Sequence, residues 1–224
     1  MKTIRSVIQN RIMRAFDRWA QEYCDAVITK LKARGYSYEV LAEKILKYLE
    51  VESDDLLVDL GTGAGPLAEH ISAREGLRVI GLDIALNMLR MAKRHGNYKG
   101  LSQASAEHLP FAPHTVDHVF STFMLHSVLD QKQALNEILR VMKTGRTGVV
   151  VDLCIQPNAS RVWRFIKANL HSLRYEYGAL SIYRTPDEYS RLLDQQGLKV
   201  TAIEQLGLKK EYTHYLFAFK ILGA

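Results

Sequence analysis

Cysteine is scarce in this sequence, and long apolar runs are absent from it. The two cysteines, Cys24 and Cys154, stand far apart and outside any CxxC or Cys/His cluster of the kind that binds zinc. We therefore expect reduced thiols and no metal site. No segment has the roughly 20 apolar residues of a membrane-spanning helix, and the N-terminus lacks the apolar block of a signal peptide. These absences predict a cytoplasmic protein without an integral membrane segment.

Charge of one sign is not concentrated anywhere in the chain. The 30 basic and 24 acidic residues are interspersed, so the net charge of +6 indicates a solvated surface rather than a nucleic-acid partner. A length of 224 residues with 47% hydrophobic content predicts one domain with appendages. The sequence leaves the oligomeric state open, with a homodimer among the alternatives.

The first fifty residues read as helices. Apolar residues recur at helical spacing from Ile4 to Val27, with Arg11, Arg14 and Arg18 on another face, and a second helix is expected from Tyr38 to Leu49. We expect residues 1–50 to form a helical lid. The alternatives for the first helix are that it packs on the domain by its apolar side or that it lies at a membrane surface.

Residues 51–224 alternate short apolar strands with helices, as a doubly wound α/β sheet does. The expected strands are Leu56–Leu60, Arg78–Asp83, Leu101–Ala104, Val116–Ser121, Thr147–Leu153, Leu198–Ile203 and Tyr215–Ile221. The expected helices are one opened by Pro66, one over Leu86–Arg94, one capped by Asp130, and one with a capping box at Thr185. This pattern predicts an α/β, Rossmann-like, seven-stranded, mostly parallel sheet with an antiparallel last strand. N-terminal helices and a cap insertion around residues 156–184 complete the expected fold.

The turn after the first strand, in VDLGTGAGP, holds three glycines at the place where such folds contact nucleotides. About twenty residues later the second strand ends in Asp83, from which a carboxylate reaches the ribose hydroxyls of a nucleoside. NAD and S-adenosylmethionine both fit a glycine turn followed by such an acid. The spacing is GxGxG followed by Pro66 instead of GxGxxG, and Asp59 suits a cation better than a pyrophosphate, which favours S-adenosylmethionine.

Five motifs in order resemble those of the class I S-adenosylmethionine-dependent methyltransferases, particularly the small-molecule branch that includes the quinone-biosynthesis enzymes. They are VDLGTGAG, GLDIALNML, SAEHLPF, DHVFSTFMLHSV and NEILRVMKTGRTGVVVD. FDRWAQEYCD is similar to the N-terminal segment that closes over the cofactor in this group. The resemblance spans the chain from about Phe16 to Val200 and implies an enzyme of that type.

Carried onto this chain, the resemblance implies one set of residues around the methionine part of the cofactor, a second around the adenosine part and a third facing the methyl group. These candidates are Tyr23, Asp59, Gly61, Thr62, Gly63, Gly65, Asp83, Ile84, Met88, Ser105, Ala106, Glu107, Thr122 and Phe123. Ser105 replaces an aspartate that commonly bonds the adenine amino group, and a serine hydroxyl accepts that bond more weakly.

The expected reaction transfers the methyl group to oxygen, nitrogen or carbon of a small, apolar or aromatic acceptor. His126, just after the fourth strand, is the candidate general base, and a packing histidine is the alternative. An RNA or protein methyltransferase, an NAD-dependent oxidoreductase and a non-catalytic S-adenosylmethionine-binding protein are the competing hypotheses. The sequence has no NPPY-like motif and no appended RNA-binding domain, which disfavours the first of these.

Overall fold

The computed structural model describes most of the chain. The described residues are 4–73, 76–95, 97–155, 160, 162–163, 165–166, 169–170, 181–209 and 212–223. Most of the predicted cap insertion, residues 156–184, therefore lies outside the described residues. Within the described part, no helix combines the length and the hydropathy needed to cross a bilayer.

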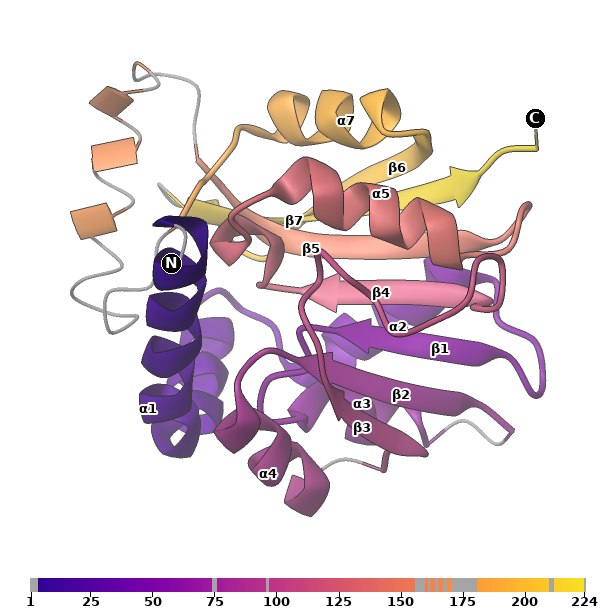
Figure 1. The fold of residues 1–224 in the computed structure, drawn as a ribbon, viewed down its shortest axis with the longest axis horizontal. Helices are drawn as coiled ribbons and strands as arrows, with labels where there is room; N and C mark the ends of the chain where they lie inside the picture. Colours follow the sequence, from indigo (N-terminus) through magenta and orange to yellow (C-terminus); the bar gives the residue numbers. More distant parts are fainter. Residues whose placement is uncertain are drawn as a thin grey trace.

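A seven-stranded sheet forms the centre of the molecule (Figure 1). The strands are β1 (Leu56–Leu60), β2 (Arg78–Asp83), β3 (Gly100–Gln103), β4 (His118–Thr122), β5 (Thr147–Ile155), β6 (Leu198–Leu206) and β7 (Tyr212–Ile221). Their order across the sheet is β3-β2-β1-β4-β5-β7-β6, and β7 runs antiparallel to both of its neighbours while β1 to β5 are parallel. The predicted fold class, including the antiparallel last strand, is confirmed.

Helices cover both faces of this sheet. They are α1 (Ile4–Lys32), α2 (Tyr38–Leu49), α3 (Pro66–Ile71), α4 (Leu86–His95), α5 (Gln131–Val141) and α7 (Pro186–Gln195), with a short 3₁₀ turn, η1 (Leu125–Ser127). Alternate strand residues point to opposite faces. Leu57 and Val149 therefore share a core with α2 and α3, whereas Val58 and Val150 share another with α5 and α7.

The predicted helix starts are confirmed where a side chain caps the helix. Asp130 accepts a hydrogen bond from the backbone N–H of Gln133 at 3.0 Å, and Thr185 and Glu188 form a reciprocal capping box at α7. Helix α1 continues five residues beyond the predicted Val27, to Lys32. Its last turn carries Lys30 and Lys32, whose positive charges interact favourably with the helix C-terminus.

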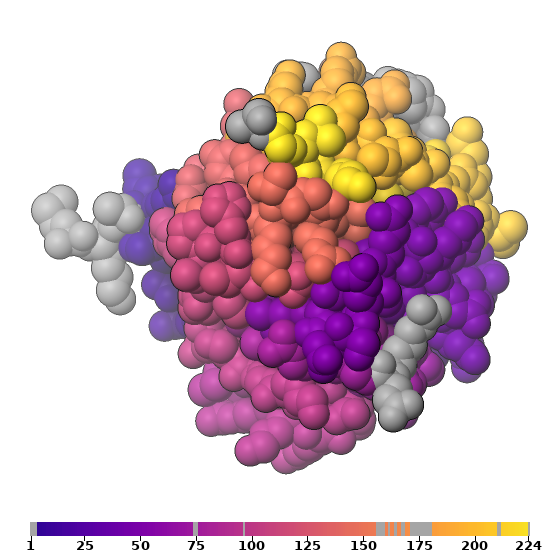
Figure 2. Space-filling model, turned by 90° about the vertical axis from the view of Figure 1, so that its right-hand side faces the viewer, coloured from indigo at the N-terminus to yellow at the C-terminus, as the bar shows by residue number. Residues whose placement is uncertain are grey.

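Helix α1 stands at the end of the sheet where the parallel strands finish (Figure 1). It buries Ile12, Trp19, Val27 and Leu31 toward the domain. Figure 2 views the opposite end of the sheet. There the C-terminal residues contact the segment before β5, and the Gly145 N–H donates to the Ile221 carbonyl at 2.8 Å. The ends of the parallel strands and α1 therefore face each other across the space where a ligand would bind in this fold.

Candidate active site

A hollow of about 730 Å³ lies between α1 and the carboxyl ends of β1 and β2, and is called the main hollow below. It is lined by Gln9, Ile12, Phe16, Tyr23, Leu60, Gly61, Gly63, Leu82, Asp83, Ile84, Met88, Ala104, Ser105, Ala106, Glu107, Phe123, Met124, Ser127, Val128 and Leu129. Most of the lining is apolar, as is usual for ligand sites. Ten of the predicted residues are in this set, from Tyr23 to Phe123.

The glycine turn has backbone angles that favour glycine. Gly61, Gly63 and Gly65 have φ of 78°, 55° and 88°. A Cβ on Gly61 would overlap the side chain of Met124, and a Cβ on Gly65 would lie 2.8 Å from the Cα of Ala92. Gly61 and Gly63 thus border the main hollow, whereas Gly65 lets α3 and α4 pack closely.

The N–H groups of this turn are already used within the protein. Gly61 donates to the Leu82 carbonyl at 2.8 Å, and Gly63 donates to Asp83 Oδ2 at 2.9 Å. Gly65 donates to the Thr62 carbonyl at 3.1 Å. A phosphate-binding loop needs such N–H groups directed at the ligand. The turn therefore fits a cofactor without a phosphate group.

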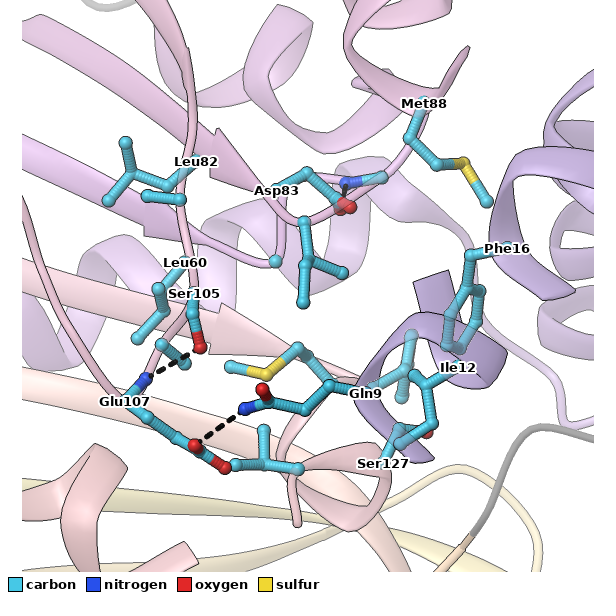
Figure 3. Close-up of a pocket in the computed structure, with 18 of the residues that line it drawn as sticks. Gln9, Ile12, Phe16, Leu60, Leu82, Asp83, Met88, Ser105, Glu107 and Ser127 are labelled. Carbon is cyan, nitrogen blue, oxygen red and sulfur yellow. Dashed lines mark hydrogen bonds between the residues drawn. The ribbon is translucent and has the colours of Figure 1, made fainter. Parts of the chain in front are cut away.

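Asp83 ends β2 at the wall of the main hollow. Its two carboxylate oxygens accept hydrogen bonds from the N–H groups of Gly63 and Ala85, at 2.9 Å and 2.8 Å. Burial raises the pKa of this carboxyl to about 6, although the two backbone hydrogen bonds act in the opposite direction. Ile84 and Met88 add apolar side chains to the same lining, and Figure 3 shows Met88 with Asp83.

Asp59 lies behind the turn and does not line the main hollow. Its Oδ2 accepts hydrogen bonds from Thr62 Oγ1 at 2.6 Å and from the Tyr98 hydroxyl at 2.9 Å. Burial raises the pKa of Asp59 to about 6. Among the described residues its Oδ1 has no hydrogen-bond partner. The structure thus gives Asp59 and Thr62 contacts that hold the turn, with Tyr98 as a partner that no sequence motif indicated.

Glu107 joins the main hollow to α1. Its side chain is only 3% exposed and accepts hydrogen bonds from Arg5 Nη2 and Gln9 Nε2, each at 2.7 Å, and from the Asp130 N–H at 2.9 Å. Figure 3 shows Gln9 pointing to this carboxylate. Ser105 Oγ accepts from the Glu107 N–H at 3.2 Å. Glu107 therefore lines the main hollow, and its carboxylate is bonded to α1.

A second hollow, of about 800 Å³, adjoins the first and shares Phe16, Tyr23 and Phe123 with it. The rest of its lining is Trp19, Val27, Lys30, Leu31, Arg34, His126, Leu153 and His214. Phe123 has φ of 55°, a left-handed conformation that is costly for a residue with a side chain. The strained residue at the end of β4 thus lies at the border of the two hollows.

His126 faces the second hollow and is held by a buried acid. Its Nδ1 lies 2.5 Å from Asp152 Oδ1, and its backbone N–H donates to Asp152 Oδ2 at 2.8 Å. The Tyr189 hydroxyl donates to the same Oδ2 at 2.7 Å, and Asp152 is fully buried within β5. An acid that accepts from Nδ1 favours the neutral tautomer with the lone pair on Nε2, as a general base requires.

Some site residues were not predicted. Ile12 belongs to the apolar stripe of α1, which the periodicity could have indicated, whereas no apolar pattern marks Gln9. Asp152 is an acid inside the apolar run TGVVVDL, a signal for a buried polar role. No motif in the sequence around Tyr189 indicates its bond to Asp152. Conversely, the predicted residues Asp59, Thr62, Gly65 and Thr122 do not line the main hollow.

Comparisons with known proteins agree with this geometry. A family model described as "Methyltransferase domain" matches residues 58–150. The chain is 31% identical to the demethylmenaquinone methyltransferase of Chlorobaculum tepidum over 165 residues, which cover 70% of this chain and 67% of that one. It is 26% identical to the Chlorobaculum parvum enzyme of the same name over 218 residues, covering 88% and 90%.

Among solved structures, the fold is similar to a chain in the complex between the Haloferax volcanii Trm112 methyltransferase activator and a methyltransferase. The TM-score is 0.73 at 20% identity, and the match covers 93% of this chain and 98% of that chain. The same family is indicated by the sheet order, by the glycine turn followed by Asp83, and by the sequence relatives. The chain belongs to the class I S-adenosylmethionine-dependent methyltransferases, enzymes that here transfer the methyl group to a small-molecule acceptor.

Proposed function

We propose that the main hollow holds S-adenosylmethionine and the second hollow holds the acceptor, with methyl transfer where the two adjoin. The observation that carries this proposal is the lining that the hollows share, Phe16, Tyr23 and Phe123. When bound, the cofactor supplies a methyl group on a positively charged sulfur. The chain's own contribution is to hold the nucleophile in line with that group and to keep water out.

The described residues fit the cofactor. Asp83 offers a carboxylate to the ribose hydroxyls, and the apolar side chains of Ile84 and Met88 form a wall for an adenine ring. Gly61 and Gly63 contribute bare backbone to the lining, beside the side chains of Met124 and Tyr23. The hydroxyl of Ser127 is buried in the lining without a hydrogen-bond partner among the described residues, and a polar atom of the ligand would satisfy it.

The acceptor that we propose is apolar or aromatic. Phe16, Trp19, Tyr23 and Phe123 give the second hollow aromatic walls, against which a flat apolar molecule packs well. Demethylmenaquinone, in the names of both relatives, is therefore the first acceptor to test.

His126 acts as the general base where the acceptor keeps a proton on the atom to be methylated. Asp152 orients the imidazole and stabilises the positive charge that forms when Nε2 takes the proton. Substituting His126→Gln should lower kcat by about 10²–10⁴-fold with little effect on cofactor affinity. Release of S-adenosylhomocysteine in the presence of demethylmenaquinone measures this. An unchanged kcat would leave His126 a packing residue.

Cofactor binding has a test that needs no acceptor. S-adenosylhomocysteine should raise the melting temperature of the protein, because a ligand that binds only the folded state stabilises it. Asp83→Ala should abolish the shift, whereas Asp25→Ala, an exposed acid on α1, should keep it. A shift that survives Asp83→Ala would count against the proposed ribose contact.

A further inference from the structure

The second hollow has two chemically different ends. Phe16, Tyr23 and Phe123 lie at the end shared with the main hollow. Lys30, near the end of α1, and Arg34, in the turn that follows α1, add positive charge farther along. The rise of 1.5 Å per residue in a helix separates the backbones of Tyr23 and Lys30 by about 10 Å, and Arg34 follows in the turn after α1. Tyr23 and Lys30 both belong to α1, so the spacing between them is set by the helix.

The guanidinium of Arg34 has few partners. Its Nη1 donates to the Lys30 carbonyl at 3.2 Å and its Nη2 donates to the Tyr212 carbonyl at 3.3 Å. Its Nε is buried and has no hydrogen-bond partner among the described residues. Burial lowers the pKa of Arg34, which reflects the cost of a charge withdrawn from water. A cation in this state gains from an anionic ligand.

The surrounding side chains make this end of the hollow electropositive. No acidic side chain is among the described residues that line the second hollow. Lys30 lies 5.0 Å from the centre of the Trp19 ring, a cation–π contact that keeps its ammonium group beside the hollow. Burial, followed by the positive field of Arg34, lowers the pKa of His214 to about 2. His214 therefore stays neutral and does not compete for an anion.

We infer that the far end of the second hollow binds an oxyanion, a carboxylate or a phosphate, carried by the acceptor about 10 Å or more from the atom that is methylated. This inference rests on the proposed role of the hollow as the acceptor site. Arg34 provides the Nε–H and the rest of its planar donor set, and Lys30 adds a second positive charge. The acceptor is then an elongated molecule with a reactive apolar head and an acidic tail.

Isothermal titration with defined probes tests the inference, with S-adenosylhomocysteine at saturation. The probes are 6-(1-naphthyloxy)hexanoate, its methyl ester and 5-(1-naphthyloxy)pentyl phosphate. At least one anionic probe should bind about tenfold or more tightly than the ester, because hydrogen bonds to charged groups are the strong ones. Comparing the two anions shows which oxyanion the site prefers.

Variants of Arg34 tie the preference to this residue. Arg34→Gln should reduce the ratio between anion and ester affinities to about twofold or less, while Arg34→Lys should retain part of it. Arg11→Gln, an exposed arginine on another face of α1, is the matched control and should leave the ratio unchanged. Circular dichroism confirms that each variant is folded.

The outcomes separate the two proposals. Equal binding of ester and anions to the unaltered protein, or a preference that survives Arg34→Gln, would overturn the oxyanion site and leave the acceptor hollow standing. Failure of all three probes to bind would overturn both.

Discussion

The carboxyl group of Asp83 gives the main hollow a pH dependence that can be calculated. Burial raises its pKa from 3.8 to about 6, so the group is mostly ionised at pH 8 and about one-tenth ionised at pH 5. Ribose hydroxyls donate hydrogen bonds to the ionised form. The affinity for S-adenosylhomocysteine should therefore fall about twofold by pH 6 and about tenfold by pH 5, or about 1.4 kcal/mol.

The stability of the cofactor-free protein should respond with the opposite sign. A carboxyl whose pKa is higher in the folded than in the unfolded state binds its proton more tightly when folded. Its contribution to the free energy of unfolding therefore decreases as the pH rises from about 4 through about 6. Hydrogen bonds from the ligand to the ionised carboxylate offset this loss.

Isothermal titration with S-adenosylhomocysteine at pH 5, 6, 7 and 8 measures the effect. Asp83→Asn should bind more weakly at pH 8 and show little change with pH. Asp59→Asn is the matched control, because Asp59 also has a pKa of about 6 but lies outside the main hollow, and it should keep the pH dependence. A constant affinity from pH 8 to pH 5, or a tenfold change retained in Asp83→Asn, would refute the reasoning.

Three further changes probe the supporting contacts. Asp152→Asn should lower kcat by about 10²–10⁴-fold and alter the pH profile of kcat without changing cofactor affinity, measured by titration; an unaltered profile would exclude an orienting role. Glu107→Gln should speed amide hydrogen exchange in the first three turns of α1 and not in its last turns, since it weakens the anchor of the N-terminal half; uniform exchange would contradict this. Gly145→Ala should cost about 1–2 kcal/mol of unfolding free energy for its φ of 80°, and Gly65→Ala about 1–3 kcal/mol more for the contact with Ala92; equal losses in urea unfolding would contradict the packing argument.

Local sequence was sufficient for elements whose limits depend on nearby residues. The predicted bounds Leu56–Leu60 and Arg78–Asp83 are those of β1 and β2, because apolar runs end at turn residues there. The bounds of β6 and β7 were predicted too short. In β6 half-buried and exposed residues alternate between a buried first and last residue, so its polar residues concealed a strand that continues to Leu206 by pairing with β7.

The main hollow also combines features that local sequence predicts with features that it does not. The glycine turn and Asp83 are contiguous with their strands, so spacing alone predicted that they would meet at one edge of the sheet. The contact of Glu107 with Arg5 and Gln9 joins segments about a hundred residues apart, and no local pattern encodes it.

The sequence by itself determined the strand and helix order, the phosphate-free glycine turn and the candidate His126. Those features follow from periodicity and from backbone conformations that neighbouring residues impose. Only the tertiary structure decided that His126 meets Asp152, that Tyr189 bonds the same acid, and that Arg34 and His126 line one hollow. Such contacts depend on how separate elements pack, because burial and charge partners are properties of the assembled fold.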